Sequence, residues 1–274
     1  MKHILFSTLL LISPPVSADI TTGWKAYETG NYIEALEIAT SSTAADRYAL
    51  ACMAGVAQGG TIDKGPTAVQ TLHKTIENCT EALKVNQDDF EITAALSTAL
   101  SFEGKRKKAT DHANIARALL FDLIDKFPEK PESFGAYATW HSEVYAAGFF
   151  ARVALGAKKD IARDMFAEGK KRGEFDTGLQ LEYVKFLARG KKADRAQAIT
   201  EAEKLLNADR NSPLDGYFIN IGQRLLEALK TENKKLLKKR LKQASLFAGI
   251  EEEKATSTFK LDPWLENYAE SLKK

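Results

Sequence analysis

Side chains that commonly carry out chemistry are few in this chain. Its 274 residues include only four histidines and two cysteines. The most distinctive run around any of them is Trp140-His141-Ser142-Glu143. In a helix, positions 141 and 143 point about 200° apart, which makes His141 and Glu143 a weak candidate for an acid–base pair.

Patterns for metal and phosphate binding are missing from the sequence. It contains no His-x3-His, no Cys-x2-Cys and no acidic calcium loop. Gly59-Gly60 with Gly65 does not match a phosphate-binding loop, and no nucleophile-elbow motif is present. The sequence therefore predicts no metal, no cofactor and no enzymatic activity.

Aromatic residues near position 140 suggest binding rather than catalysis. Tyr137 and Trp140 share one helix face, as do His141 and Tyr145. Two interpretations stay open for this group. It lines a concave pocket, or it packs in the core between long helices with the imidazole hydrogen-bonded to a neighbouring helix.

A second unusual feature is a strongly basic helix near the C-terminus. Its cationic residues are Lys230, Lys234, Lys235, Lys238, Lys239, Arg240 and Lys242. Such a helix can contact anionic lipid or an acidic partner, or it can be the solvated face of an ordinary packed helix. Aromatic anchors are sparse there, so the solvated face is favoured and membrane contact is not expected. The whole chain has a net charge of +2, which gives no reason to expect nucleic-acid binding.

The elements that would position these residues all read as helices. Apolar residues recur at helical spacing, most clearly over 109–127, and strict alternation of the strand type is rare. Glycines and prolines mark the helix ends. The other helices are expected near 43–58, 66–85, 88–104, 132–154, 158–172, 175–188, 214–230 and 232–247, with one more ending near 207.

One stretch indicates how these helices are arranged. Between Trp24 and Ala39 the chain carries Gly30, then Tyr32 two residues later, then Ala35 three after that. The glycine permits a tight turn between two helices, and the alanine lets their backbones approach. This stretch resembles the middle of a tetratricopeptide (TPR) repeat.

Later segments resemble the second helix of a TPR unit. The positions that carry the likeness are Ala116, Leu120, Ala162 and Phe166. The second helices end at spacings of about 42, 45 and 34 residues, whereas TPR units repeat every 34 or so. The chain therefore resembles a divergent TPR-like protein. The resemblance implies an all-α, right-handed solenoid of stacked antiparallel hairpins, with about 12 or 13 helices.

The last helix is expected to cover the end of this solenoid. Asp262-Pro263 is a strong N-cap and first-turn pair, and the predicted helix runs over about 262–272. Terminal repeats need such a cover for their apolar face. Residues 19–274 are therefore expected to form a single TPR-like domain with a C-terminal capping helix.

The N-terminus has the pattern of a secretory signal peptide. Lys2 and His3 precede an apolar run over 4–12, and Val16-Ser17-Ala18 fits the small residues before a cleavage site. The run is about half the length needed to span a bilayer. We expect residues 1–18 to be removed and the mature protein to be periplasmic or secreted.

Two cysteines, Cys52 and Cys79, remain in the expected mature chain. An even number in an exported protein favours a disulfide. With helices at 43–58 and 66–85, however, an ideal hairpin offsets the two cysteines by about 10 Å. A disulfide and two small buried thiols are both open interpretations.

The sequence favours a non-enzymatic scaffold or adaptor that binds a protein or peptide in the groove of a helical solenoid. The candidate groove residues are Tyr27, Tyr137, Trp140, His141 and Tyr183. One alternative is an accessory protein for solute transport that holds a small hydrophobic ligand, similar to the helical subunits of TRAP-type transporters. Another is an unrecognised envelope enzyme, which requires a His–carboxylate pair in a pocket.

Overall fold

The fold is known from a computed structural model, which describes residues 19–231, 233–253 and 259–272. These residues form α-helices, one π-helical turn (η1) and one 3-10 turn (η2), with no strand among them. The expected signal peptide, residues 1–18, lies outside the described residues. The elements are α1 (Ile20–Glu28), α2 (Tyr32–Ser41), α3 (Arg47–Ala57), η1 (Gln58–Ile62), α4 (Gly65–Val85), α5 (Phe90–Lys107), α6 (Thr110–Lys126), α7 (Pro131–Ala146), α8 (Phe149–Leu155), α9 (Lys159–Arg172), α10 (Thr177–Ala188), α11 (Lys192–Leu206), α12 (Pro213–Lys230), α13 (Lys234–Gln243), η2 (Ile250–Glu252) and α14 (Pro263–Ser271).

Local sequence accounts for many of the helix starts. At α12, the Ser212 hydroxyl accepts from the Asp215 N–H at 3.2 Å, and the Ser212 N–H donates to the Asp215 carboxylate at 2.7 Å. This reciprocal capping box is followed by Pro213, whose fixed φ suits the first turn. The predicted start of the last helix is confirmed, since the Asp262 side chain accepts from the Trp264 N–H.

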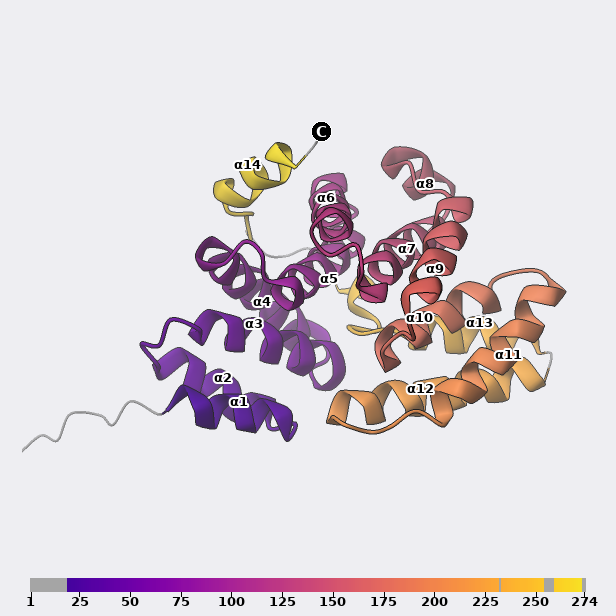
Figure 1. The fold of residues 1–274 in the computed structure, drawn as a ribbon, viewed down its shortest axis with the longest axis horizontal. Helices are drawn as coiled ribbons and strands as arrows, with labels where there is room; N and C mark the ends of the chain where they lie inside the picture. Colours follow the sequence, from indigo (N-terminus) through magenta and orange to yellow (C-terminus); the bar gives the residue numbers. More distant parts are fainter. Residues whose placement is uncertain (1–18, 232, 254–258, 273–274) are drawn as a thin grey trace, which may run out of the picture.

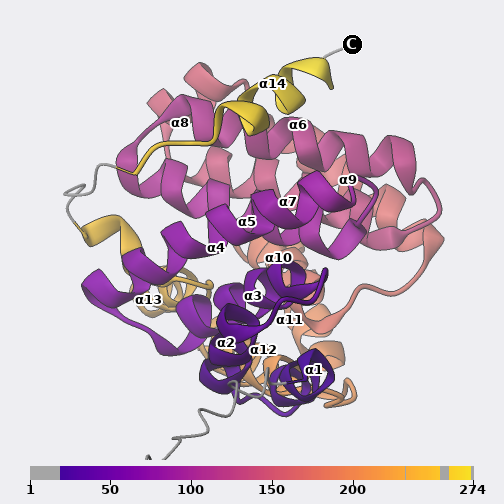
Figure 2. The ribbon, with the colours of Figure 1, turned by 90° about the vertical axis from the view of Figure 1, so that its left-hand side faces the viewer.

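Many helices pack against the next one along the chain, but α7 packs most extensively against α9, and α14 packs on α6. Additional contacts join α1 to α3, α3 to α5, α7 to α10 and α10 to α12. The course runs from α1 through α4–α6 and α7–α9 to α10–α12, so that the turn after α1 comes close to the start of α12 (Figures 1 and 2). The chain is therefore an arc of helices whose two ends approach each other.

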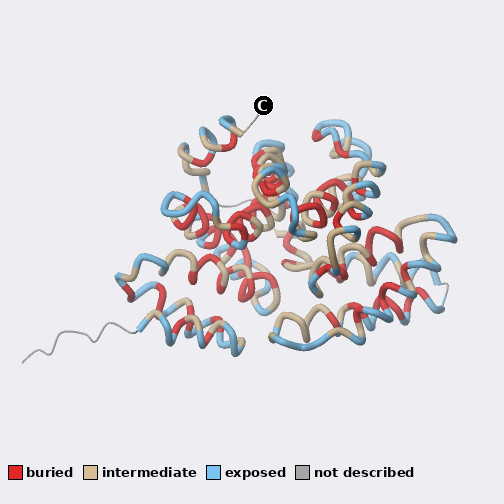
Figure 3. Tube along the Cα trace, viewed as in Figure 1, coloured by how far each residue is buried: buried red, intermediate tan, exposed pale blue. Residues whose placement is uncertain are grey.

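The buried residues gather on the sides of the helices that face other helices (Figure 3). The largest cluster is formed mainly by α3–α6, with Leu72, Leu96 and Leu119 at its centre. A second belongs to α7 and α9–α12 and includes Phe166. A smaller third cluster, around Ala35, joins α1 to α3. The TPR-like packing positions are all buried or at a turn: Tyr32, Ala35, Ala116, Leu120, Ala162 and Phe166 are at most 5% exposed, and Gly30 has a φ of +85°.

Cys52 and Cys79 form a disulfide that ties α3 to α4, with a Cα–Cα distance of 4.7 Å. The expected 10 Å offset does not arise, because η1 continues α3 for one more turn before the chain reverses. Cys52 then lies ten residues before the end at Ile62, and Cys79 lies fourteen after Gly65. The two cysteines therefore differ by four residues in their distance from the turn, whereas the expected helix ends gave a difference of seven. This smaller difference brings the cysteines within bonding distance.

The long helix expected over 132–154 is divided in two. Helix α7 ends at Ala146, and α8 begins at Phe149. Gly148 between them has a φ of +120°, a conformation that residues with a side chain rarely adopt. The described residues thus hold fourteen α-helices, more than the predicted 12 or 13.

After α13 the chain turns back toward the first helices. The return segment, residues 244–253, buries Phe247 against η1, where the Phe247 N–H donates to the Gly60 carbonyl at 2.9 Å. A Cβ on Gly59 would lie only 2.7 Å from the Phe247 ring, so glycine is what allows this approach. Helix α13 consequently ends at Gln243, earlier than the predicted 247.

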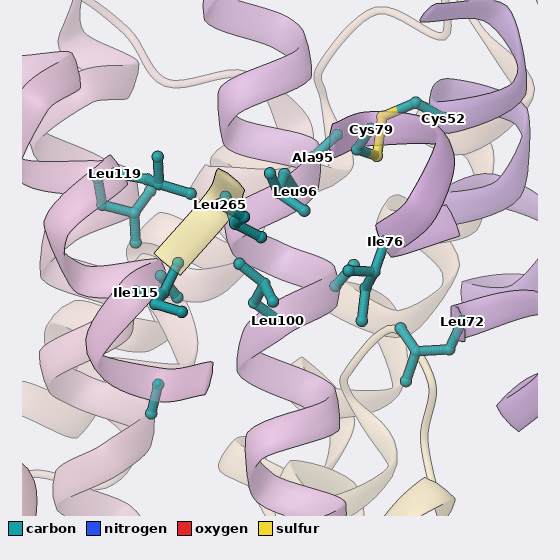
Figure 4. Close-up of a cluster of buried hydrophobic side chains, with 14 of the residues drawn as sticks. Cys52, Leu72, Ile76, Cys79, Ala95, Leu96, Leu100, Ile115, Leu119 and Leu265 are labelled. Atoms are coloured by element: carbon teal, nitrogen blue, oxygen red, sulfur yellow. A yellow bond between two sulfur atoms is a disulfide. The ribbon is translucent and has the colours of Figure 1, made fainter. Parts of the chain in front are cut away.

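Helix α14 does not cover the last hairpin as the sequence suggested. It packs on α6, and its Leu265 enters the largest cluster beside Leu96, Leu100 and Leu119 (Figure 4). Lys84 on α4 forms a salt bridge with Asp262 at 2.6 Å and fixes the start of the helix. The apolar face of α14 therefore packs on helices from the first half of the chain, because the return segment brings the chain back to them.

Candidate functional site

Three of the five aromatic candidates meet on α7. The Tyr137 and Trp140 rings lie 4.8 and 4.9 Å from the His141 ring, centroid to centroid. Trp140 is 3% exposed and His141 2%. The Trp140 indole donates to the Ala113 carbonyl at 3.0 Å, so its polar atom is already engaged. This geometry matches the core-packing interpretation of the two side chains.

His141 is held as a neutral imidazole. The Lys158 N–H donates to its Nδ1 at 3.2 Å, which places the ring proton on Nε2. Burial lowers the pKa of His141 to about 4, and the charges of Arg117 and Lys158 add to the effect. Nε2 is buried without a hydrogen-bond partner among the described residues.

The other two candidates lie elsewhere. Tyr27 on α1 packs against Tyr32, with ring centroids 5.7 Å apart. Tyr183 on α10 packs against Phe166 and accepts a hydrogen bond from Gln197 at 2.9 Å. The five residues therefore occupy three separate places, and binding of a partner at Tyr27 or Tyr183 stays a prediction.

The sequence did not identify the pocket in which cationic groups converge. This basic pocket, of about 440 Å³, lies between α5, α7, the start of α9, α10 and α13. Its walls also carry the apolar surfaces of Tyr145, Phe186 and Leu241. The cations that line it are Lys105, Lys159, Arg189, Lys238 and Lys242, against one carboxylate, Glu143.

A nearly buried ion network forms one wall of the basic pocket. Lys185, 1% exposed, lies 2.6 Å from Glu182 and 3.2 Å from Glu143, and Arg189 lies 2.8 Å from Glu143. Burial acts to raise the pKa of Glu143, but Lys185 and Arg189 outweigh it and hold that pKa far below its usual range. Glu143 is thus a fixed anion that orients Arg189, and it is unsuited to act as a general base.

The remaining cations of the pocket are less well neutralised. Lys105 reaches Glu251 at 3.7 Å, and the exposed Lys242 pairs with Glu252. Lys159 and Lys238 form no salt bridge with any described residue. The Lys159 amine instead lies 6.0 Å from the centre of the Phe186 ring. The pocket therefore offers free positive charge beside apolar surface.

A His–carboxylate pair does occur, but it lies inside the protein. His73 on α4 contacts Glu103 on α5 at 3.0 Å, and Arg106 donates to the same carboxylate at 2.6 and 2.8 Å. Burial acts to raise the pKa of Glu103, yet the hydrogen bonds from His73 and Arg106 lower it to about 2. The Phe259 ring stacks on His73 at 4.4 Å and covers it.

The cluster of His73, Glu103 and Arg106 stabilises the fold. Glu103 is completely buried, and Arg106 and His73 are 5% and 9% exposed. A paired and hydrogen-bonded buried carboxylate of this kind holds α4, α5 and the chain near Phe259 together. The Glu103–Arg106 spacing of three residues on one helix face is the sequence signal that could have revealed half of it.

Among the described residues, no group of three or more histidine, cysteine, aspartate or glutamate side chains is placed to hold a metal ion. Within the same part of the chain, every helix is too short or too polar to cross a bilayer.

Comparison with known proteins gives no relative for this chain. No family model matches it, no curated protein matches it, and no solved structure matches it. The likeness to TPR repeats therefore depends on Gly30, Tyr32, Ala35 and the later packing positions, together with the order in which the helices pack.

Proposed function

We propose that this chain is an exported, non-enzymatic helical-repeat protein that binds an acidic segment of a protein or peptide in the basic pocket. The observation that carries the proposal is the presence of Lys159 and Lys238, which form no salt bridge among the described residues, beside Phe186 and Leu241. Acidic side chains of a ligand would complete the ion pairs, and its apolar side chains would cover the aromatic wall.

The architecture supports this proposal. Helices that pack on both the next and the second-next neighbour form a continuous curved stack, which is how a right-handed TPR-like solenoid is built. Such stacks present several helices to one ligand, as α5, α7, α9, α10 and α13 do here. The pairing of Glu143 with Lys185 and Arg189 fixes the pocket wall in advance, which reduces the ordering cost of binding.

Export to an oxidising compartment is part of the same proposal. The Cys52–Cys79 disulfide joins two completely buried cysteines, and disulfides of this structural kind persist mainly outside the cytosol. Together with the N-terminal pattern over 1–18, this favours the bacterial periplasm as the location.

The test is a binding titration with a defined probe. A fluorescein-labelled peptide that alternates glutamate with leucine and phenylalanine is titrated with the mature protein and followed by anisotropy. We expect saturable binding that weakens as salt is added, and at least tenfold weaker binding of the same peptide with glutamine in place of glutamate.

Matched variants locate the site. Lys159→Ala with Lys238→Ala should weaken binding of the acidic peptide about tenfold or more. Lys234→Ala with Lys235→Ala removes two exposed lysines that do not line the pocket and should change binding little. Equal losses in both double variants, or equal affinity for the glutamate and glutamine peptides, would show that the proposed site is wrong.

The small-ligand and enzyme alternatives predict other results. A transport accessory protein would yield a small molecule on native mass spectrometry and would not distinguish the two peptides. The His73–Glu103 pair is the acid–base arrangement on which an enzyme hypothesis would depend, and Phe259 covers it. We therefore place the function in the basic pocket.

A further inference from the structure

A group of exposed apolar side chains stands on α8 and has no role in the basic pocket. Phe149, Phe150 and Val153 are 61%, 86% and 64% exposed, and we refer to these three residues as the apolar tip. Helix α8 lies at the outer edge of the molecule beyond α7 and α9 (Figure 1), in a region where most residues are exposed (Figure 3). Large apolar side chains that gather at one exposed place mark an interaction surface.

Helix α8, which carries the apolar tip, is held in place by the residues at its two ends. Gly148 and Gly156 adopt positive φ values of +120° and +66° and set the directions in which α8 begins and ends. Leu155 is buried, and its carbonyl accepts a hydrogen bond from Arg117 on α6 at 2.8 Å. The Phe149 and Phe150 rings pack edge to face at 5.8 Å. The tip is therefore presented to solvent by the fold.

The charged residues within α8 and its immediate flanks, between Glu143 and Asp160, are all cationic. Over residues 146–159 the chain contains Arg152, Lys158 and Lys159 and no acidic residue. The Arg152 guanidinium lies over Phe149 at 5.2 Å and over Tyr145 at 5.1 Å, so its charge sits at the base of the tip. Protruding phenylalanines flanked by cations have the chemistry that enters the headgroup region of an anionic lipid surface.

The size of the tip argues against a second copy of the chain as its occupant. Three side chains of this exposure offer roughly 400 Å², given 150–250 Å² for a phenylalanine. A stable protein–protein interface needs about 800 Å² from each partner. A lipid surface has no such minimum, because weak insertion of a few side chains adds to electrostatic attraction.

We propose that the apolar tip docks this protein reversibly on an anionic membrane surface. Phe149, Phe150 and Val153 enter the headgroup region, while Arg152 and Lys158 contact lipid phosphates. This goes beyond the proposed function, since it concerns a different surface, and it revises the expectation of no membrane contact for this part of the chain. In the sequence, the basic helix is the feature that suggests lipid contact, and aromatic anchors are sparse there.

Vesicle flotation tests the proposal. The mature protein is mixed with vesicles of phosphatidylglycerol and phosphatidylethanolamine in equal parts, and separately with vesicles of phosphatidylcholine. We expect the protein to float with the anionic vesicles, at least tenfold more than with the zwitterionic ones. Phe149→Ser with Phe150→Ser should reduce flotation about tenfold, and Arg152→Gln with Lys158→Gln should reduce it on anionic vesicles.

The control uses apolar side chains that are equally exposed elsewhere. Ile33 and Val85 are 55% and 68% exposed, so Ile33→Ser with Val85→Ser should leave flotation unchanged. Circular dichroism checks that each variant keeps its helices.

Absence of wild-type flotation, or equal loss in tip and control variants, overturns the proposal. A tip variant that floats normally but loses a defined protein partner would show instead that the tip binds protein. The pocket variant Lys238→Ala distinguishes the two proposals, because it should impair peptide binding and should not abolish flotation.

Discussion

Gly30 and Pro213 are in contact, although most of the chain separates them. A Cβ added to Gly30 would lie 2.8 Å from Cγ of Pro213. The turn between α1 and α2 thus meets the first turn of α12, and this contact closes the arc of helices. The glycine of the TPR-like stretch therefore serves both its own hairpin and the contact between that hairpin and α12.

Replacing Gly30 with alanine should destabilise the protein by about 2 kcal/mol. Its φ of +85° is strained for any other residue, and the added methyl group meets Pro213. Urea unfolding measures the effect. Gly216→Ala is the control, because Gly216 lies inside α12 with no atom close enough to meet the added Cβ, and helix propensity predicts a gain of up to about 1 kcal/mol. Similar losses in both variants would contradict the contact.

Phe247 should be the main anchor of the return segment. It is 2% exposed, and its ring packs on Gly59 and lies 5.2 Å from the Phe102 ring. Phe247→Ala should cost about 3–5 kcal/mol in the free energy of unfolding. Phe150→Ala, at a side chain 86% exposed, should change it by less than about 0.5 kcal/mol. Chemical denaturation of the two variants side by side tests this, and equal effects would show that the return segment is not anchored there.

Loss of the Cys52–Cys79 disulfide should lower stability by about 3 kcal/mol. The bond closes a loop with a sequence separation of 27, and the constraint on the unfolded chain sets this magnitude. Cys52→Ala with Cys79→Ala is compared with the wild type, oxidised and reduced, by urea unfolding. The reduced wild type should unfold near the double variant. If reduction leaves the unfolding midpoint of the wild type unchanged, the bond does not contribute as expected.

His141 should make the fold sensitive to mild acid. Its pKa is about 4 in the folded protein, against an ordinary value of 6.5 for histidine, so the unfolded chain binds the proton more readily. Stability is then fully present above pH 6.5 and declines as pH falls toward 4, by about 3 kcal/mol. The variant His141→Asn keeps an acceptor for the Lys158 N–H but does not titrate.

Unfolding of both proteins between pH 7 and pH 4 tests the role of His141. The asparagine variant should lose less stability across this range than the wild type. Burial lowers the pKa of His112 in the same direction, so part of the pH dependence should persist in the variant. Identical pH profiles would mean that His141 does not titrate with the fold.

The sequence predicted the local features well because local physics decides them. The Asp262-Pro263 start and the 109–127 helix, observed as Thr110–Lys126, follow from capping groups and helical periodicity within a few residues. The surroundings of Trp140 are an example of what local patterns do not decide. An aromatic residue on a helix face can line a groove or fill a core, and only its hydrogen bond to Ala113 shows that this one is in the core.

By itself, the sequence determined that this protein is all-α, where most helices begin and end, and which small and aromatic residues bring neighbouring helices together. The tertiary structure decided the rest. One extra turn at η1 set the register that joins Cys52 to Cys79, and the glycines there admitted Phe247 from the far end of the chain. The basic pocket likewise exists only because five helices, α5, α7, α9, α10 and α13, bring Lys105, Lys159 and Lys238 together. Such relationships depend on crossing angles and long-range packing, which short-range patterns of residues do not encode.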